Sequence, residues 1–122
     1  MSTSRRRTPS KTKAAKRSVT SNETRLDALV AEATVDAHDE SEQAGGFFAV
    51  LEDELALPFE TTLLGTSVTV EAIELRDDDR IAVRCVRGRS RQWIALEDLP
   101  LPSPAPAGAQ WIEAYRRWIE RR

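Results

Sequence analysis

Carboxylates are the side chains of this sequence most suited to chemistry, and they occur in three clusters. The clusters are Asp36/Asp39/Glu40, Glu52/Asp53/Glu54 and Asp77/Asp78/Asp79. Hard divalent cations such as calcium take roughly six to eight oxygen ligands, chiefly carboxylates and carbonyls. The sequence therefore contains a ligand set suited to calcium, although acidic runs taken on composition alone more often mark a solvated surface.

The spacing of these acids limits which kinds of calcium site they could form. It does not match an EF-hand loop, which needs acids at alternate positions, a central glycine and a distant glutamate. Three consecutive aspartates cannot all point at one ion from an extended turn, because neighbouring side chains diverge. On a predicted helix Asp53 lies nearly opposite the apolar stripe, which suits solvent exposure as well as ligation. The residues alone leave a metal site and a solvated acidic surface both open.

The chain has one histidine, His38, and one cysteine, Cys85. A single cysteine excludes an internal disulfide and any multi-cysteine zinc or iron–sulfur site, and it suits a reducing compartment. Cys85 falls in an apolar strand pattern typical of a buried structural thiol, which argues against a Cys85–His38 nucleophilic pair. Because no nucleophile–base pair can be named, we expect no catalytic residues and no enzymatic activity.

Arginines form the other cluster, around a predicted hairpin that also holds Trp93. They are Arg84, Arg87, Arg89 and Arg91. Small barrels often bind RNA or DNA with such cationic and aromatic surfaces. The same arginines can instead pair with the acids of the domain, which outnumber them, so contacts with an anionic partner and internal ion pairs are both open.

Charge divides the chain into two parts. The whole chain has 18 basic and 20 acidic residues and a net charge of −2, but residues 1–17 contain seven basic residues and no acid. Residues 18–122 then have 11 basic and 20 acidic residues, a net charge of −9. Residues 1–20 contain almost nothing apolar, so we expect a disordered basic tail that attracts nucleic acid or serves as a solubility tail or tether.

The remaining residues, 21–122, are long enough for one domain. No apolar stretch approaches the roughly 18–20 residues that span a bilayer, and the N-terminus has no apolar run. We therefore expect a soluble cytoplasmic protein with no membrane partner.

Helix signals occur at both ends of this domain. A capping-box pattern at 20–23 and apolar residues at helical spacing predict a helix over 22–34. Asp39 can cap a second helix that ends before Pro58, and Gly45-Gly46 inside it requires either a close backbone approach or a later helix start. An aromatic amphipathic helix follows Gly108 and is expected to dock on its own sheet or in the groove of a partner protein.

Alternating apolar residues predict strands over 59–64, 67–75, 81–86 and 92–96. The alternation changes phase between Ala72 and Ile73, which predicts a β-bulge or sharp bend. Four of the six prolines lie in 99–106, which predicts an extended Pro-rich strap. The expected fold is α+β: a small antiparallel sheet of about four to five strands that curls into a barrel, with a preceding helix and a C-terminal helix docked by the strap.

Two linked segments, 35–47 (VDAHDESEQAGGF) and 51–59 (LEDELALPF), resemble the cyanobacterial CcbP-type calcium-binding protein family. The likeness covers roughly residues 35–99, and residues 100–122 lie beyond this family-like core. The resemblance implies a small α+β domain with an SH3-like curled sheet that buffers or senses calcium without an EF-hand and without catalysis.

The shared motifs and the acidic domain together give a calcium-binding hypothesis. The candidate metal ligands are Asp36, Asp39, Glu52, Asp53, Asp77, Asp78 and Asp79. The aspartate turn is short here, and its flanking arginines, Arg76 and Arg80, would oppose a cation. The alternative is a protein- or nucleic-acid-interaction module that uses the basic tail and the arginine hairpin.

Overall fold

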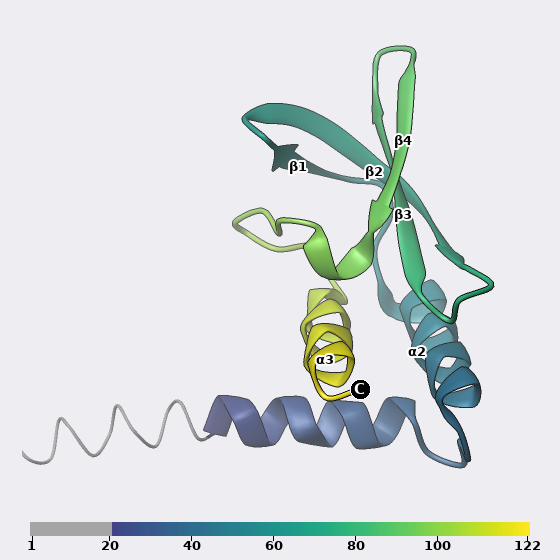
Figure 1. The fold of residues 1–122 in the computed structure, drawn as a ribbon. Helices are drawn as coiled ribbons and strands as arrows, with labels where there is room; N and C mark the ends of the chain where they lie inside the picture. Colours follow the sequence, from purple (N-terminus) through teal and green to yellow (C-terminus); the bar gives the residue numbers. More distant parts are fainter. Residues whose placement is uncertain (1–20) are drawn as a thin grey trace, which may run out of the picture.

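The computed structural model describes residues 21–122, which form three helices and one four-stranded antiparallel sheet (Figure 1). The first helix covers residues 21–33 of the described chain. The later elements are α2 (Glu40–Glu54), β1 (Phe59–Leu63), β2 (Thr66–Leu75), β3 (Ile81–Arg87), β4 (Ser90–Ala95), the 3-10 helix η1 (Leu96–Asp98) and α3 (Ala109–Glu120). The predicted α+β class is confirmed. The predicted basic tail lies outside the described residues and stays a prediction, as does the domain boundary.

The first helix and α2 meet at a glycine. A Cβ on Gly46 would overlap the backbone carbonyl of Ala33 at the end of the first helix, whereas a Cβ on Gly45 would meet nothing within 4 Å. The Gly45-Gly46 pair therefore lies inside the helix, as one of the two sequence interpretations required, and Gly46 supplies the close approach.

The sheet is a meander in the order β1-β2-β3-β4, with antiparallel pairing throughout. The register between β2 and β3 shifts between Val70 and Ala72, which confirms the bulge predicted from the change of phase. The extra residue lets Val70 pair with Cys85 and Ile73 with Val83, so that apolar side chains before and after the bulge face the same side. That side packs against the helices and forms the core.

The sheet is not closed, so neither the predicted SH3-like barrel nor the predicted Pro-rich strap is confirmed. After η1 the chain passes β1, where the Thr61 hydroxyl donates a hydrogen bond of 2.6 Å to the carbonyl of Pro100. Pro100 and Pro102 have no backbone N–H, so this segment cannot form a regular ladder with β1. Proline chemistry thus explains why the sheet has four strands and two edges among the described residues.

The aromatic helix α3 packs inside the domain. The rings of Phe47, Tyr115 and Trp118 form a cluster with centroid separations of 5.4–5.9 Å. The Tyr115 hydroxyl accepts a hydrogen bond of 2.9 Å from the backbone N–H of Ile81, so the helix is bonded to the start of β3. Of the two predicted destinations for this helix, the structure shows the one inside its own chain.

The first helix crosses the C-terminal end of α3 (Figure 1). Asp27 forms ion pairs of 2.7 Å with Arg117 and 2.9 Å with Arg121. No helix among residues 21–122 combines the length and apolar character that crossing a membrane requires.

Candidate metal site

The N-terminus of α2 collects the first group of acids. Asp39 has an extended backbone and accepts a hydrogen bond of 2.8 Å from the backbone N–H of Glu42, so it caps the helix as predicted. Glu40 and Glu42 lie in the first turn. Carboxylates are stable there because the unpaired N–H groups and the helix dipole favour negative charge.

The β2–β3 turn presents the second group. The backbone N–H of Arg76 donates to the carbonyl of Arg80 at 2.8 Å, and Asp79 adopts a left-handed conformation with φ 64°. The Asp78 carboxylate accepts a hydrogen bond of 3.1 Å from the backbone N–H of Arg80. Aspartate tolerates the left-handed region better than most residues, so this run of aspartates suits a tight turn.

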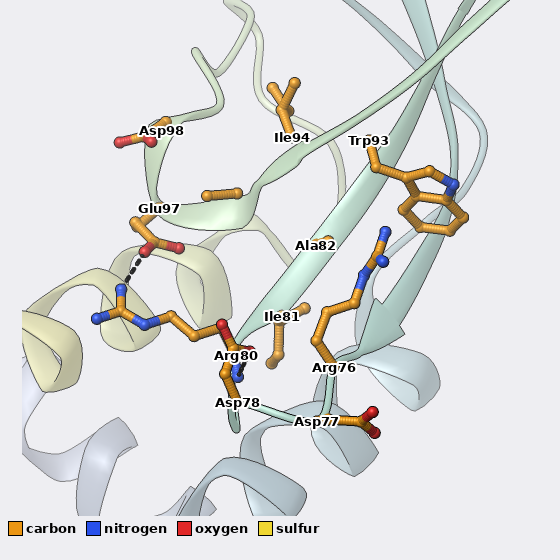
Figure 2. A pocket seen from close by; sticks show the side chains of 11 residues that line it. Arg76, Asp77, Asp78, Arg80, Ile81, Ala82, Trp93, Ile94, Glu97 and Asp98 are labelled. Carbon is orange, nitrogen blue, oxygen red and sulfur yellow. Dashed lines mark hydrogen bonds and ion pairs between the residues drawn. The ribbon is translucent and has the colours of Figure 1, made fainter.

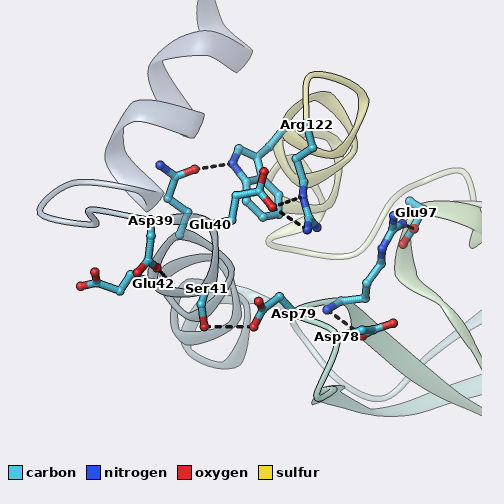
Figure 3. Close-up of polar contacts among 11 residues, drawn as sticks. Asp39, Glu40, Ser41, Glu42, Asp78, Asp79, Glu97 and Arg122 are labelled. Atoms are coloured by element: carbon cyan, nitrogen blue, oxygen red, sulfur yellow. Dashed lines mark hydrogen bonds and ion pairs between the residues drawn. The ribbon is translucent and has the colours of Figure 1, made fainter.

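One hydrogen bond joins the two groups (Figure 3). The Ser41 hydroxyl, in the first turn of α2, donates to the Asp79 carboxylate at 3.0 Å, across 38 residues of sequence. The fold therefore brings Asp79 of the turn against the first turn of α2, which Asp39 caps, whereas Asp77 and Asp78 lie on the side of the turn that faces the outer side of the sheet. Ser41 is a residue that the sequence interpretation missed, because no local pattern indicates its partner.

The arginines that flank the turn are occupied elsewhere. Arg80 forms an ion pair of 2.7 Å with Glu97, and the Arg76 guanidinium lies 4.8 Å from the centre of the Trp93 ring (Figure 2). The expectation that these arginines oppose a cation at the turn stays a prediction: Glu97 neutralises Arg80, whereas Arg76 has no ion pair among residues 21–122.

Asp36 lies between the first helix and α2. It is exposed and adopts a left-handed conformation with φ 64°. It makes no hydrogen bond or ion pair with another described residue, and it precedes the α2 cap by three positions in the chain. It is therefore available at the entry to the junction.

Glu52 and Asp53 lie at the other end of α2. At about 1.5 Å per residue, the 14 positions between Asp39 and Asp53 correspond to about 20 Å along the helix axis. Asp53 lines a separate hollow with Glu32 and Trp111. The predicted ligand set therefore divides, because one ion cannot reach both ends of the helix.

The donor chemistry of the junction fits calcium and fits softer metals poorly. Its side chains offer carboxylate and hydroxyl oxygens, the ligands that hard divalent cations prefer. Among residues 21–122, however, no group of three or more His, Cys, Asp or Glu side chains lies in an arrangement that would hold a metal ion. The junction therefore has suitable oxygen ligands, but their side chains are not close enough together in this structure to coordinate one ion.

Neither the cysteine nor the histidine belongs to this site. Cys85 is buried in the core, where burial raises the pKa of its thiol. A raised pKa disfavours the thiolate that nucleophilic attack and metal ligation both need. His38 is exposed between the first helix and α2.

The arginine hairpin has only partial internal pairing. Arg84 forms an ion pair of 2.7 Å with Glu71, on the neighbouring strand, and Arg87 donates to the backbone carbonyl of Ser67 at 3.3 Å. Arg89 and Arg91 are exposed and form no ion pair with residues 21–122. None of the four pairs with the three acidic clusters within the described chain.

Comparison with known proteins identifies the fold and the family. Two solved structures are similar to this chain: a calcium-binding protein in its calcium-binding form (TM-score 0.62, 22% identity, covering 81% of this chain and 91% of that one) and Anabaena CcbP (TM-score 0.57, 22% identity, covering 81% and 89%). No curated protein matched the chain. The family model for CcbP, described as calcium binding, matches residues 27–119. The chain therefore belongs to the CcbP family of calcium-binding proteins.

Proposed function

We propose that this protein is a non-enzymatic calcium buffer or sensor that binds the ion where the first turn of α2 meets the β2–β3 turn. Family membership supports calcium as the ligand. The observation that supports this location is the hydrogen bond between Ser41 and Asp79, which joins two acidic groups that are far apart in sequence.

The ligands at this junction come from Asp39 and from the turn Asp77–Asp79, whose side chains diverge so that not all three reach one ion, with Asp36 at its entry. None of these carboxylates forms an ion pair with an arginine among the described residues, so a cation there displaces no arginine, although it competes with the hydrogen bonds that Asp39, Asp78 and Asp79 accept. Calcium tolerates irregular geometry and several waters in its coordination shell. An ion can therefore draw exposed side chains together by rotation about their side-chain bonds, without an EF-hand loop.

Glu52 and Asp53 remain candidate ligands only for a second, separate site. Their distance along α2 excludes them from the junction, and the hollow that Asp53 lines is formed with Glu32 of the first helix and Trp111 of α3. This separation supplies a matched control within one helix.

A calcium titration of isotope-labelled full-length protein, followed by NMR, tests the proposal. We expect amide shifts concentrated at residues 39–42 and 76–80, with a weaker response to magnesium. Asp79→Asn should weaken binding, whereas Asp53→Asn should leave the shifts at the junction unchanged. Shifts spread over all acidic surfaces, or an equal response to magnesium, would contradict a specific site.

A second candidate function is recognition of an anionic partner by the β3–β4 hairpin. It is favoured by Arg89 and Arg91, which are exposed and form no ion pair with residues 21–122. Electrostatic binding to nucleic acid is strongest at low salt. Absence of a mobility shift for a labelled oligonucleotide at about 50 mM salt would remove nucleic acid as the partner.

A further inference from the structure

A groove runs over the outer face of the sheet, beside the edge strand β4 (Figure 2). Its volume is about 880 Å³, and Ala82 and Ala95 lie among its lining residues. These two alanines face each other across β3 and β4, so small side chains leave the hollow between larger walls. We call it the Trp93 groove.

One wall is an exposed aromatic ring. Trp93 is 37% exposed, whereas Trp111 and Trp118 are buried in the core. The guanidinium groups of Arg76 and Arg84 lie 4.8 and 5.7 Å from the centre of the Trp93 ring. The indole therefore attracts cations, as the negative face of an aromatic ring allows, and a docked lysine or arginine would share the ring with Arg76 and Arg84 or displace them.

The lining also has more acids than bases: Asp77, Asp78, Glu97 and Asp98 against Arg76 and Arg80. Arg80 and Glu97 neutralise each other through their ion pair of 2.7 Å. Asp77, Asp78 and Asp98 are exposed and form no ion pair with residues 21–122, and all three line the groove. An aromatic platform beside unpaired carboxylates suits a segment that carries lysine or arginine.

This chain contains such a segment. Residues 5–17 carry seven basic residues and no acid. Twenty residues precede the described chain, and at most about 3.3 Å per residue they can span about 66 Å, enough to reach any face of a domain of this size. Covalent attachment also gives the segment a local concentration in the millimolar range. From this complementarity of charge and reach, we infer that the Trp93 groove is the docking surface for the basic N-terminal segment of the same chain.

Docking has a consequence for calcium, and this step rests on the proposed function. The β2–β3 turn contributes Asp79 to the bond with Ser41, while Asp77 and Asp78 line the groove. The same aspartates would then serve the basic segment and the ion. Calcium and the segment must therefore compete, and each weakens the binding of the other by the same factor.

Paramagnetic labelling of the full-length chain tests the inference. Ser10→Cys provides a thiol for a nitroxide, because the native Cys85 is buried and does not compete for the label. In calcium-free buffer of low ionic strength, we expect a loss of half or more of the amide intensity at Asp77, Asp78 and Asp98. Raising the salt to about 0.5 M shortens the Debye length to a few ångströms and should restore that intensity.

Two control variants separate the groove from other acidic surfaces. Adding Asp98→Asn, which lies outside the proposed calcium ligands, should reduce the intensity loss at the groove. Adding Asp53→Asn, on the far end of α2, should leave it unchanged. No loss at the groove, or a greater loss at Glu52–Glu54, would overturn the inference. Transfer of the broadening from nitroxide-labelled chains to separate isotope-labelled chains would assign the segment to a second copy and would also overturn it.

Calcium addition distinguishes this inference from the proposed function. If both hold, calcium shifts the junction amides and restores the groove intensity. If calcium shifts no amide, the proposed function fails while the calcium-free docking result stands on its own. If calcium binds the junction and the broadening persists, competition through the shared turn is wrong.

Discussion

The two ends of α2 carry similar numbers of acids in different surroundings. In the first turn, Glu40 pairs with Arg122 at 2.9 Å and Ser41 bonds to Asp79, so two other elements converge there. In the last turn, the side chains of Glu52, Asp53 and Glu54 are exposed and make no hydrogen bond or ion pair with residues 21–122. Glu32 of the first helix and Trp111 of α3 also lie beside Asp53, so other elements meet both ends of α2. The comparison teaches that a candidate site is defined by polar contacts between the elements that meet at it, since the count of carboxylates is similar at both ends.

Calcium binding should give the largest difference between the two ends of α2. At about 100 times Kd, a ligand that binds only the folded state raises the free energy of unfolding by about 2.7 kcal/mol. We expect this gain in the wild type and in a Glu52→Gln/Asp53→Asn variant, and its loss in an Asp77→Asn/Asp79→Asn variant. Urea unfolding with and without a calcium chelator measures it. Equal gains in both double variants would show that the ion does not bind at the junction.

The next largest difference is expected between alanine substitutions at the two adjacent glycines of α2. A Cβ on Gly46 would overlap the carbonyl of Ala33, so Gly46→Ala should lower the free energy of unfolding by about 1–3 kcal/mol. Gly45 has nothing within 4 Å of its Cβ position, so Gly45→Ala should raise it by about 0.5–1 kcal/mol through helix propensity. Thermal or urea unfolding of both variants decides, and a loss of stability in Gly45→Ala would contradict the assigned packing.

Much of the fold could be predicted because its signals are local. The Asp39 cap, the strand alternation and the bulge near Ala72 each depend on a few neighbouring residues, and all three are confirmed. Closure of the sheet could not be predicted in the same way. It depends on whether the chain after η1 can pair with β1, and at that contact Pro100 offers a carbonyl but no N–H.

The candidate site shows the same division. The sequence indicated the acids on both sides of the junction, but the bond between Ser41 and Asp79 spans 38 residues and follows only from tertiary packing. The sequence also placed Glu52 and Asp53 in one ligand set with Asp39, because residue type alone does not encode the distance along a helix. The occupation of Arg80 by Glu97 likewise needed the position of η1.

A smaller contrast between the two ends of α2 concerns the helix cap. Asp39→Ala removes the acceptor for the Glu42 N–H and should lower the free energy of unfolding by about 1 kcal/mol in calcium-free buffer. Asp53→Ala removes an exposed side chain that has no hydrogen bond or ion pair with residues 21–122, so it should change the free energy of unfolding by less than about 0.5 kcal/mol. Urea unfolding of both variants tests the difference. Equal effects would mean that the cap adds no stability.

The smallest expected effect extends the comparison to an acid that already has internal cations. The hydrogen bond from Arg117, helped by Arg121, lowers the pKa of the Asp27 carboxyl below its ordinary value. Because the pKa is lower in the folded state, the ionised Asp27 carboxyl stabilises the protein above about pH 4. This stabilisation is lost as the pH falls through the lowered pKa. Asp27→Asn should therefore flatten the loss of stability between about pH 4 and pH 2, with less difference at high salt because the pair is exposed. Urea midpoints across this range, with Asp53→Asn as the unpaired control, measure the slope; an unchanged slope in Asp27→Asn would show that the ion pair between the first helix and α3 does not contribute to acid stability.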